Sequence, residues 1–209
     1  MATRPASRPY HHGDLPAALV EATFALVEEK GVHDFSVAEA ARRTGVSAAA
    51  PYRHFTDRDE LLAEAATRAT QELRRRFTAA LEVGGSAADH VAAFAAAYVR
   101  FAAERRAMFE VMFGAGLEKA RYPRLEAETE GLMGDLVEAA LPLAPRRDPG
   151  HAHALVFAIG GLAQGHATLL LDHAFGPGDE GVEEAAARAA AATRALVRGR
   201  RLLFSELGG

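Results

Sequence analysis

The sequence contains no cysteine, and this absence excludes several classes of protein. Without thiols the chain cannot form a disulfide scaffold, a cysteine-ligated zinc site or a thiol nucleophile. Its first residues, MATRPASRPYHHGD, lack the apolar segment of a secretory signal, so we expect a cytoplasmic protein. The enzyme motifs G-x-S-x-G and H-E-x-x-H and the phosphate-binding loop are also absent. We therefore predict a protein that is not an enzyme and has no cofactor or metal.

Residues that favour β-strands are scarce, whereas alanine is abundant in a chain that is 49% apolar. Because alanine is the strongest helix former, we predict an all-α protein with about nine helices. The longest apolar run, at 154–171, contains Gln164, His166 and three glycines. We interpret this run as a buried helix of a chain that does not enter a membrane.

Local signals predict where the helices begin and end. Leu15, Leu19 and Leu26 lie on one face of a helix at 15–30, which Gly31 ends. Ser36 and Glu39 have the spacing of a capping box for the next helix. Helices after this pair are expected from Ser47, after TDRDE at 56–60, and at 87–105, 107–114, 123–141, 151–174 and 182–206.

The segment GVSAAAPYRHF at 45–55 resembles the second half of a helix-turn-helix. Ala48 and Ala49 are small enough to let a helix approach base edges, and Tyr52, Arg53 and His54 can bind phosphates. The alternative is an ordinary helical hairpin with solvated polar residues. The net charge of −4 does not by itself indicate a nucleic-acid binder, but residues 36–58 carry four arginines against two acids.

Pro51 interrupts this predicted recognition helix. A proline lacks the N–H that would bond to the Ser47 carbonyl, and it disfavours helical angles at Ala50. We therefore predict a short recognition helix whose first turn is distorted or 3₁₀-like.

The stretch SVAEAARRTGVSAAAPYRHFTDRDELL is similar to the signature of the TetR family of bacterial transcription regulators, over about residues 14–66. The resemblance implies a basic arm at 1–13, a three-helix helix-turn-helix domain at 14–60, and a larger helical domain for ligand binding and dimerisation at 61–209. It implies a homodimer that binds double-stranded palindromic operator DNA and releases it when a small apolar effector binds. The alternative function is a helical small-molecule carrier or interaction module without sequence-specific DNA binding.

The resemblance also implies roles for single residues. Tyr52 and His54 would bind phosphates beside Arg53, and Arg58 stands where the family usually has lysine. Pro51 replaces a usual Leu, Ile or Val, and the plain alanine face suggests that DNA shape contributes to specificity. The arm either reaches DNA or makes no contact. The predicted DNA contacts are Arg4, Arg8, Ser36, Arg43, Ser47, Ala48, Ala49, Tyr52, Arg53, His54 and Arg58.

A family member would bind its effector between the C-terminal helices and dimerise through the last two. Aromatic and methionine residues at helical spacing are more often part of the hydrophobic core than of a pocket. For each candidate, both pocket lining and core packing stay open. The pocket candidates are Phe94, Tyr98, Phe101, Phe109, Met112, Phe113, Met133, Phe157 and His166. Gly161 and Gly165 would admit a helix of a second copy, or else pack closely within one subunit. The other predicted dimer contacts are Leu169, Leu196 and Leu203.

Overall fold

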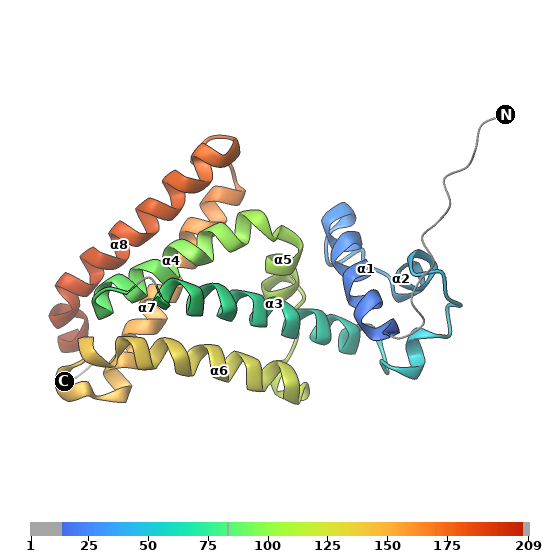
Figure 1. Cartoon of the computed structure of the whole chain (residues 1–209), viewed down its shortest axis with the longest axis horizontal. Helices are drawn as coiled ribbons and strands as arrows, with labels where there is room; N and C mark the ends of the chain where they lie inside the picture. The colour runs from blue at the N-terminus through green and yellow to red at the C-terminus, as the bar shows by residue number, and fades with distance from the viewer. Residues whose placement is uncertain (1–13, 83, 207–209) are drawn as a thin grey trace.

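The computed structural model describes residues 14–82 and 84–206, and every regular element in these ranges is helical. The all-α prediction is therefore confirmed. The α-helices are α1 Leu15–Lys30, α2 Val37–Arg43, α3 Arg58–Glu82, α4 Ala87–Glu104, α5 Arg106–Gly114, α6 Pro123–Ala140, α7 Pro149–Leu171 and α8 Gly178–Glu206. Four short 3₁₀ turns accompany them: η1 Pro51–Arg53, η2 Lys119–Arg121, η3 Leu141–Leu143 and η4 Pro145–Arg147. The molecule is elongated, with α1 and α2 at one end (Figure 1).

The first helix has the predicted bounds. Asp14 caps it, because its carboxylate accepts the Ala17 amide at 3.0 Å. Leu19 and Leu26 are fully buried on its inner face. Gly31 ends the helix with a φ of 84°, a value that favours glycine.

The start of α2 differs from the prediction. Ser36 is the N-cap residue, but its side chain makes no capping hydrogen bond. Glu39 instead accepts a hydrogen bond from the Lys30 ammonium at 2.6 Å, and this bond lowers the pKa of Glu39. The predicted capping box is wrong because a charged donor at the end of α1 engages the glutamate more strongly than the Ser36 amide would.

The recognition segment is a 3₁₀ turn and not an α-helix, as the Pro51 argument predicted. The Ser47 carbonyl accepts the Ala50 amide at 2.9 Å, so the turn closes before the proline is reached. Ala50 nevertheless keeps helical angles of −62° and −42°, so the predicted displacement of this residue is wrong. Ser47 caps no helix, and the described chain has eight α-helices in place of the predicted nine.

Two clusters of buried hydrophobic residues divide the molecule along its length. The first joins α1, α2 and Phe55 to the start of α3, including Leu61. The second joins the rest of α3, including Phe77, to α4, α6, α7 and α8. The long helix α3 runs through both clusters (Figure 1) and links them mechanically. Asp57 caps it through a hydrogen bond from the Glu60 amide at 2.8 Å, one of the two caps predicted.

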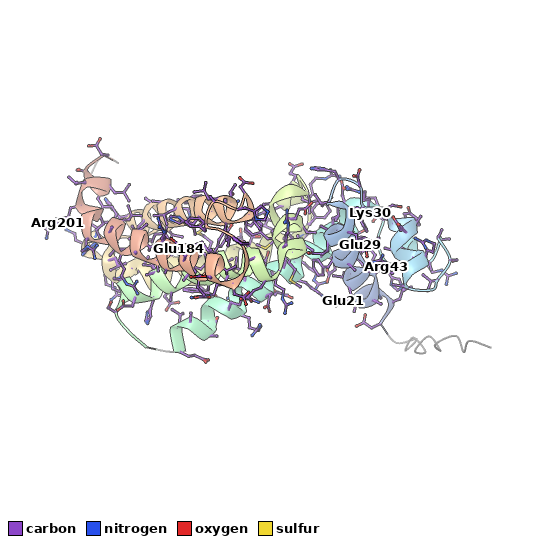
Figure 2. All side chains as sticks on the ribbon, turned by 90° about the horizontal axis from the view of Figure 1, so that it is seen from above. Glu21, Glu29, Lys30, Arg43, Glu184 and Arg201 are labelled. Atoms are coloured by element: carbon purple, nitrogen blue, oxygen red, sulfur yellow. The ribbon has the colours of Figure 1, made fainter. Side chains whose placement is uncertain are left out.

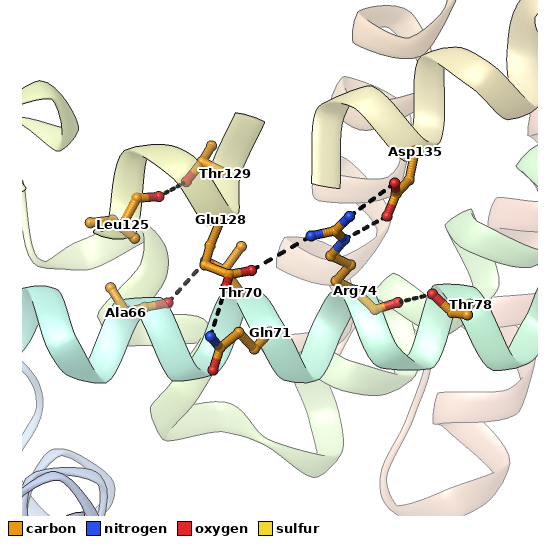
Figure 3. A network of polar contacts seen from close by, with 9 residues as sticks. All are labelled: Ala66, Thr70, Gln71, Arg74, Thr78, Leu125, Glu128, Thr129 and Asp135. Carbon is orange, nitrogen blue, oxygen red and sulfur yellow. Dashed lines mark hydrogen bonds and ion pairs between the residues drawn. The ribbon is translucent and has the colours of Figure 1, made fainter. Parts of the chain in front are cut away.

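Polar contacts also hold α6 against α3. The Arg74 guanidinium reaches both carboxylate oxygens of Asp135, with Nε to Oδ2 at 2.5 Å and Nη2 to Oδ1 at 3.1 Å (Figure 3). Gln71 donates to Glu128 at 2.8 Å one turn away. A side chain at Gly131 would come within 2.6 Å of Arg74, so this glycine makes room for the fork-like pair.

The remaining helices lie where they were predicted, but some bounds differ, and α7 ends at Leu171 in place of 174. α7 begins at Pro149, where Asp148 accepts the His151 amide at 2.8 Å. α7 is also the one helix within 14–82 and 84–206 that is long and apolar enough to cross a membrane, and a third of that apolar window is buried. It is therefore a helix with one buried face, and its other face requires an explanation.

Candidate nucleic-acid interface and effector groove

The turn at 47–54 presents its side chains to solvent from a fixed base. Pro51 is buried and Phe55 is 6% exposed, so these two residues anchor the turn to the first core. Tyr52 is 56% exposed. No hydrogen bond or ion pair occupies the side chains of Tyr52, Arg53 or His54 in the part of the chain that the structure describes. The predicted contacts exposed here are Ser47, Ala48, Ala49, Tyr52, Arg53 and His54.

The predicted contact Arg43 is already paired within the chain. Its guanidinium makes two hydrogen bonds to Glu29 of α1, at 2.9 and 2.7 Å (Figure 2). The hydrogen bond from Arg43 lowers the pKa of Glu29, and the pKa of Arg43 is raised in turn. The pair fixes α2 against α1, and a phosphate would have to compete with Glu29 for this arginine.

Arg58 is likewise engaged. Its Nη2 donates to the Val32 carbonyl at 2.6 Å and its Nε donates to the Phe35 carbonyl at 3.3 Å. The guanidinium also lies 5.7 Å from the centre of the Phe35 ring and pairs with Asp59. The resemblance implied a phosphate contact for Arg58. In this structure its side chain instead holds the loop between α1 and α2.

The three other predicted contacts are Ser36, Arg4 and Arg8. Ser36 is partly buried at the start of α2, and its hydroxyl is not used as a cap. Arg4 and Arg8 lie outside the described residues.

The sequence reasoning missed a contact between the helix-turn-helix and α5. Glu110 of α5 accepts the Val32 amide at 2.6 Å. A side chain at Gly31 would come within 3.2 Å of the Glu110 carboxylate, and one at Gly114 within 3.3 Å of Val32. These glycines permit the close approach. The contact spans 78 positions of sequence, so no local pattern could have indicated it.

Aromatic residues predicted for the effector pocket form a connected cluster. Ring centres are 5.8 Å apart for Phe94 and Tyr98, 5.8 Å for Tyr98 and Phe109, and 5.0 Å for Phe109 and Phe113. The Tyr98 hydroxyl donates to Gln164 of α7. Burial raises the pKa of Tyr98, so this hydroxyl stays protonated and acts as a donor.

The cluster opens into a groove of about 390 Å³ between α5 and the end of α7. Phe109 and Phe113 line it together with Arg106, Leu171 and Asp172. Arg106 has no ion pair within the described ranges, and Glu110, Thr168 and Asp172 line the groove beside the aromatic and aliphatic side chains. Apolar walls combined with placed polar groups are typical of small-molecule sites.

Other pocket candidates lie apart from this groove. Phe101 is fully buried, and Met112 and Met133 are partly buried against the second core. His166 donates through Nδ1 to the Leu162 carbonyl, 2.9 Å away, and stacks on Phe175. Phe157 does not join the cluster, because its side chain is 61% exposed on the outer face of α7. That placement removes it from the candidate pocket.

Phe157 belongs instead to an exposed apolar face of α7. Gly161, Gly165 and Leu169 follow it at intervals of four residues, and all three are exposed. A side chain at Gly161 or Gly165 would meet no atom of another described element within 4 Å. These glycines therefore do not serve close packing inside the subunit. Leu196 and Leu203 are partly buried on α8, next to the exposed Leu202.

Comparisons with known proteins agree with this architecture. Residues 19–65 match the family model of bacterial regulatory proteins of the tetR family, and residues 91–193 match a tetracyclin repressor-like C-terminal domain. No curated protein matches the sequence significantly.

Solved structures share the fold over nearly the whole chain. A protein of unknown function from a Rhodococcus species is 27% identical, with a TM-score of 0.73 over 90% of this chain and 98% of its own. A TetR-family regulator from Bordetella parapertussis is 19% identical, with a TM-score of 0.62 over 89% and 95%. The regulator FadR from Bacillus subtilis, in complex with stearoyl-CoA, is 13% identical, with a TM-score of 0.66 over 87% and 96%. With its helix-turn-helix and helical C-terminal domain, this chain belongs to the TetR family of bacterial transcriptional regulators.

Proposed function

We propose that the protein is a cytoplasmic, homodimeric repressor that binds a palindromic operator and releases it when a small apolar effector binds. It would act without catalysis, with residues 14–60 binding DNA and 61–209 binding the effector and the second copy. The observation that carries the proposal is the exposed turn at 47–54. It presents a phenol, a guanidinium and an imidazole, all unpaired in the described chain, beside two exposed alanines.

Within this turn the polar groups would bind phosphates and the alanines would face the bases. Tyr52, Arg53 and His54 supply the donors that phosphate oxygens accept. Ala48 and Ala49 offer methyl groups that can contact thymine methyls but cannot form side-chain hydrogen bonds to base edges. Sequence preference would then rest on thymine contacts, on Arg53 and on DNA shape. Arg43 and Arg58 would support the turn through their contacts inside the chain.

An apolar effector is supported by the aromatic cluster around Tyr98 and the groove at Phe109 and Phe113. FadR from Bacillus subtilis, solved with stearoyl-CoA, is an example of this fold with a ligand that carries a long apolar acyl chain. Pairing through α7 and α8 is supported by the exposed face that Phe157, Gly161 and Leu169 form. A second copy placed there would form a four-helix bundle and remove this face from water.

Fluorescence anisotropy tests the DNA-binding part directly. The labelled duplex should carry a palindrome from the intergenic DNA beside the gene, and a scrambled duplex of equal length is the reference. We expect tight binding to the palindrome that weakens steeply with salt. Equal affinity for both duplexes would refute sequence-specific regulation.

A matched pair of arginine variants locates the interface. Arg53 and Arg201 are both exposed and lack ion-pair partners in the described ranges, and Arg201 lies at the opposite end of the molecule (Figure 2). Arg53→Ala should weaken operator binding by about 1–3 kcal/mol, whereas Arg201→Ala should leave it unchanged. A loss of the same size in both variants would contradict the assignment of the turn.

A further inference from the structure

A second groove lies where the recognition turn meets the start of α6. Its volume is about 480 Å³, within the range of small-molecule sites. Phe55, Ala63 and Leu125 give it an apolar lining, and His54 and Tyr122 line it as well. None of the residues predicted for the effector pocket lines this groove, so it is a separate feature of the molecule.

Two carboxylates line the groove, and they are engaged differently. Glu64 pairs with Arg124 at 2.6 Å, so its charge is balanced. Glu60 accepts hydrogen bonds from the Thr56 amide and hydroxyl through its Oε2 atom alone. Its Oε1 atom has no hydrogen-bond partner among residues 14–82 and 84–206. A charged oxygen is therefore available to a ligand.

The electrostatic surroundings of Tyr122 point the same way. Burial raises the pKa of its phenol, and the nearby charges of Asp59, Asp57 and Glu60 raise it further, against an opposing effect of Arg121. Asp59, Asp57 and Glu60 thus act on the phenol in one direction, and Arg121 acts in the other. An aromatic ring beside a carboxylate oxygen that has no partner can attract a cation.

We propose that this groove binds a small organic cation with an apolar body, with Glu60 as its counter-ion and Tyr122 as its aromatic surface. An amine or a quaternary ammonium group carried on a ring or short alkyl chain has the required chemistry. The apolar body would occupy the lining of Phe55, Ala63 and Leu125. The binding does not depend on the proposed regulation of DNA. An anion held by Arg121 and His54 is the opposing outcome of the test below.

The four tyrosines make the site observable in the full-length protein. Labelling with 3-fluorotyrosine gives one ¹⁹F resonance for each, and Tyr→Phe variants assign them. Tyr122 reports on this groove, Tyr98 on the aromatic cluster and Tyr52 on the recognition turn. Titration with benzyltrimethylammonium should shift the Tyr122 resonance saturably and leave Tyr98 and Tyr52 unmoved. Phenylacetate and benzyl alcohol, the anionic and neutral probes, should shift Tyr122 at least tenfold less effectively.

Glu60→Gln tests the counter-ion. The amide keeps an acceptor for Thr56 but removes the charge, so affinity for benzyltrimethylammonium should fall about tenfold, which corresponds to about 1.4 kcal/mol. Glu130→Gln, an exposed position on α6 outside the groove, is the matched control and should bind as the parent does. An unchanged Tyr98 resonance in Glu60→Gln verifies that the variant is folded.

Several results would overturn the proposal. They are an unmoved Tyr122 resonance, an equal response to phenylacetate, or an unchanged affinity in Glu60→Gln. A shift of Tyr98 alone would place the cation in the effector groove and would also reject the site. Operator binding is measured separately by anisotropy, so failure of this proposal and failure of the proposed regulator function are distinguishable.

Discussion

Removal of the Glu110 carboxylate should loosen the attachment of the α1–α2 loop to α5. Glu110 accepts the Val32 amide at 2.6 Å, and Val32 is only 1% exposed. In Glu110→Ala this amide would lose its partner in a place that water cannot readily enter. The surrounding helices should remain folded, because α1 keeps its contacts with Leu19 and Leu26 buried in the first core.

The size of the effect follows from the kind of bond. A hydrogen bond to a charged group contributes about 1.5–3 kcal/mol. Since about 1.4 kcal/mol is a tenfold change in an equilibrium, local opening of the loop should increase about 10- to 100-fold. Glu110→Gln keeps an acceptor without the charge, so its effect should be smaller, roughly tenfold or less.

Native-state hydrogen exchange at the Val32 amide measures this opening directly. Exchange should accelerate in the order parent, Glu110→Gln, Glu110→Ala, while the amides of Leu19 and Leu26 keep their rates. Glu130→Ala, which removes an exposed carboxylate from α6, is the control and should leave Val32 unchanged. An unaltered Val32 rate in Glu110→Ala, or equal acceleration in all of α1, would refute the reasoning.

Three further predictions concern the ion pairs and the apolar face. Arg58→Lys should lower the urea-measured free energy of unfolding by about 1–2 kcal/mol, because one ammonium cannot reproduce the planar guanidinium that reaches the Val32 and Phe35 carbonyls. Unchanged stability together with weaker DNA binding would instead support Arg58 as a phosphate contact. Phe157→Arg should convert the proposed dimer to monomer in sedimentation velocity, whereas Glu130→Ala on α6, outside the proposed interface, should not. The pKa of Glu29 is lowered in the fold, so its pair with Arg43 stabilises the folded protein at pH values above the ordinary glutamate pKa. This stabilisation is lost as the pH falls. Glu29→Gln should therefore lose less stability than the parent between roughly pH 5 and pH 3.

Most helix bounds could be predicted because the signals that start and end a helix lie in neighbouring residues. Gly31 and the apolar spacing of Leu19 and Leu26 fixed α1, and the proline argument gave the 3₁₀ character of the recognition turn. The start of α8 was predicted four residues late, at 182 in place of Gly178. Gly181 looked like a breaker, but it lies in the first turn of the helix. There a side chain would come within 2.5 Å of the Gly176 carbonyl, so packing against the preceding loop requires glycine.

Contacts between distant segments account for what the sequence could not reveal. Lys30 competes for Glu39, Glu29 competes for Arg43, and Glu110 holds Val32 across 78 positions. The groove between the recognition turn and the start of α6 was not predicted either, since it joins that turn to Tyr122, the residue before α6. No spacing rule connects such pairs, because each depends on how whole helices are placed.

Composition alone could not separate the exposed face of α7 from the groove at Phe109. The helix at 149–171 is apolar on nearly every side, so Phe157 was as reasonable a pocket residue as Phe109. Its exposed side, at intervals of four residues through Gly161 and Gly165, faces away from the second core. An exposed phenylalanine beside glycines with open space around them is costly for an isolated subunit in water. We therefore propose that a second copy of the chain covers this face, whereas the groove at Phe113 and Leu171 is lined by neither Phe157 nor the two glycines.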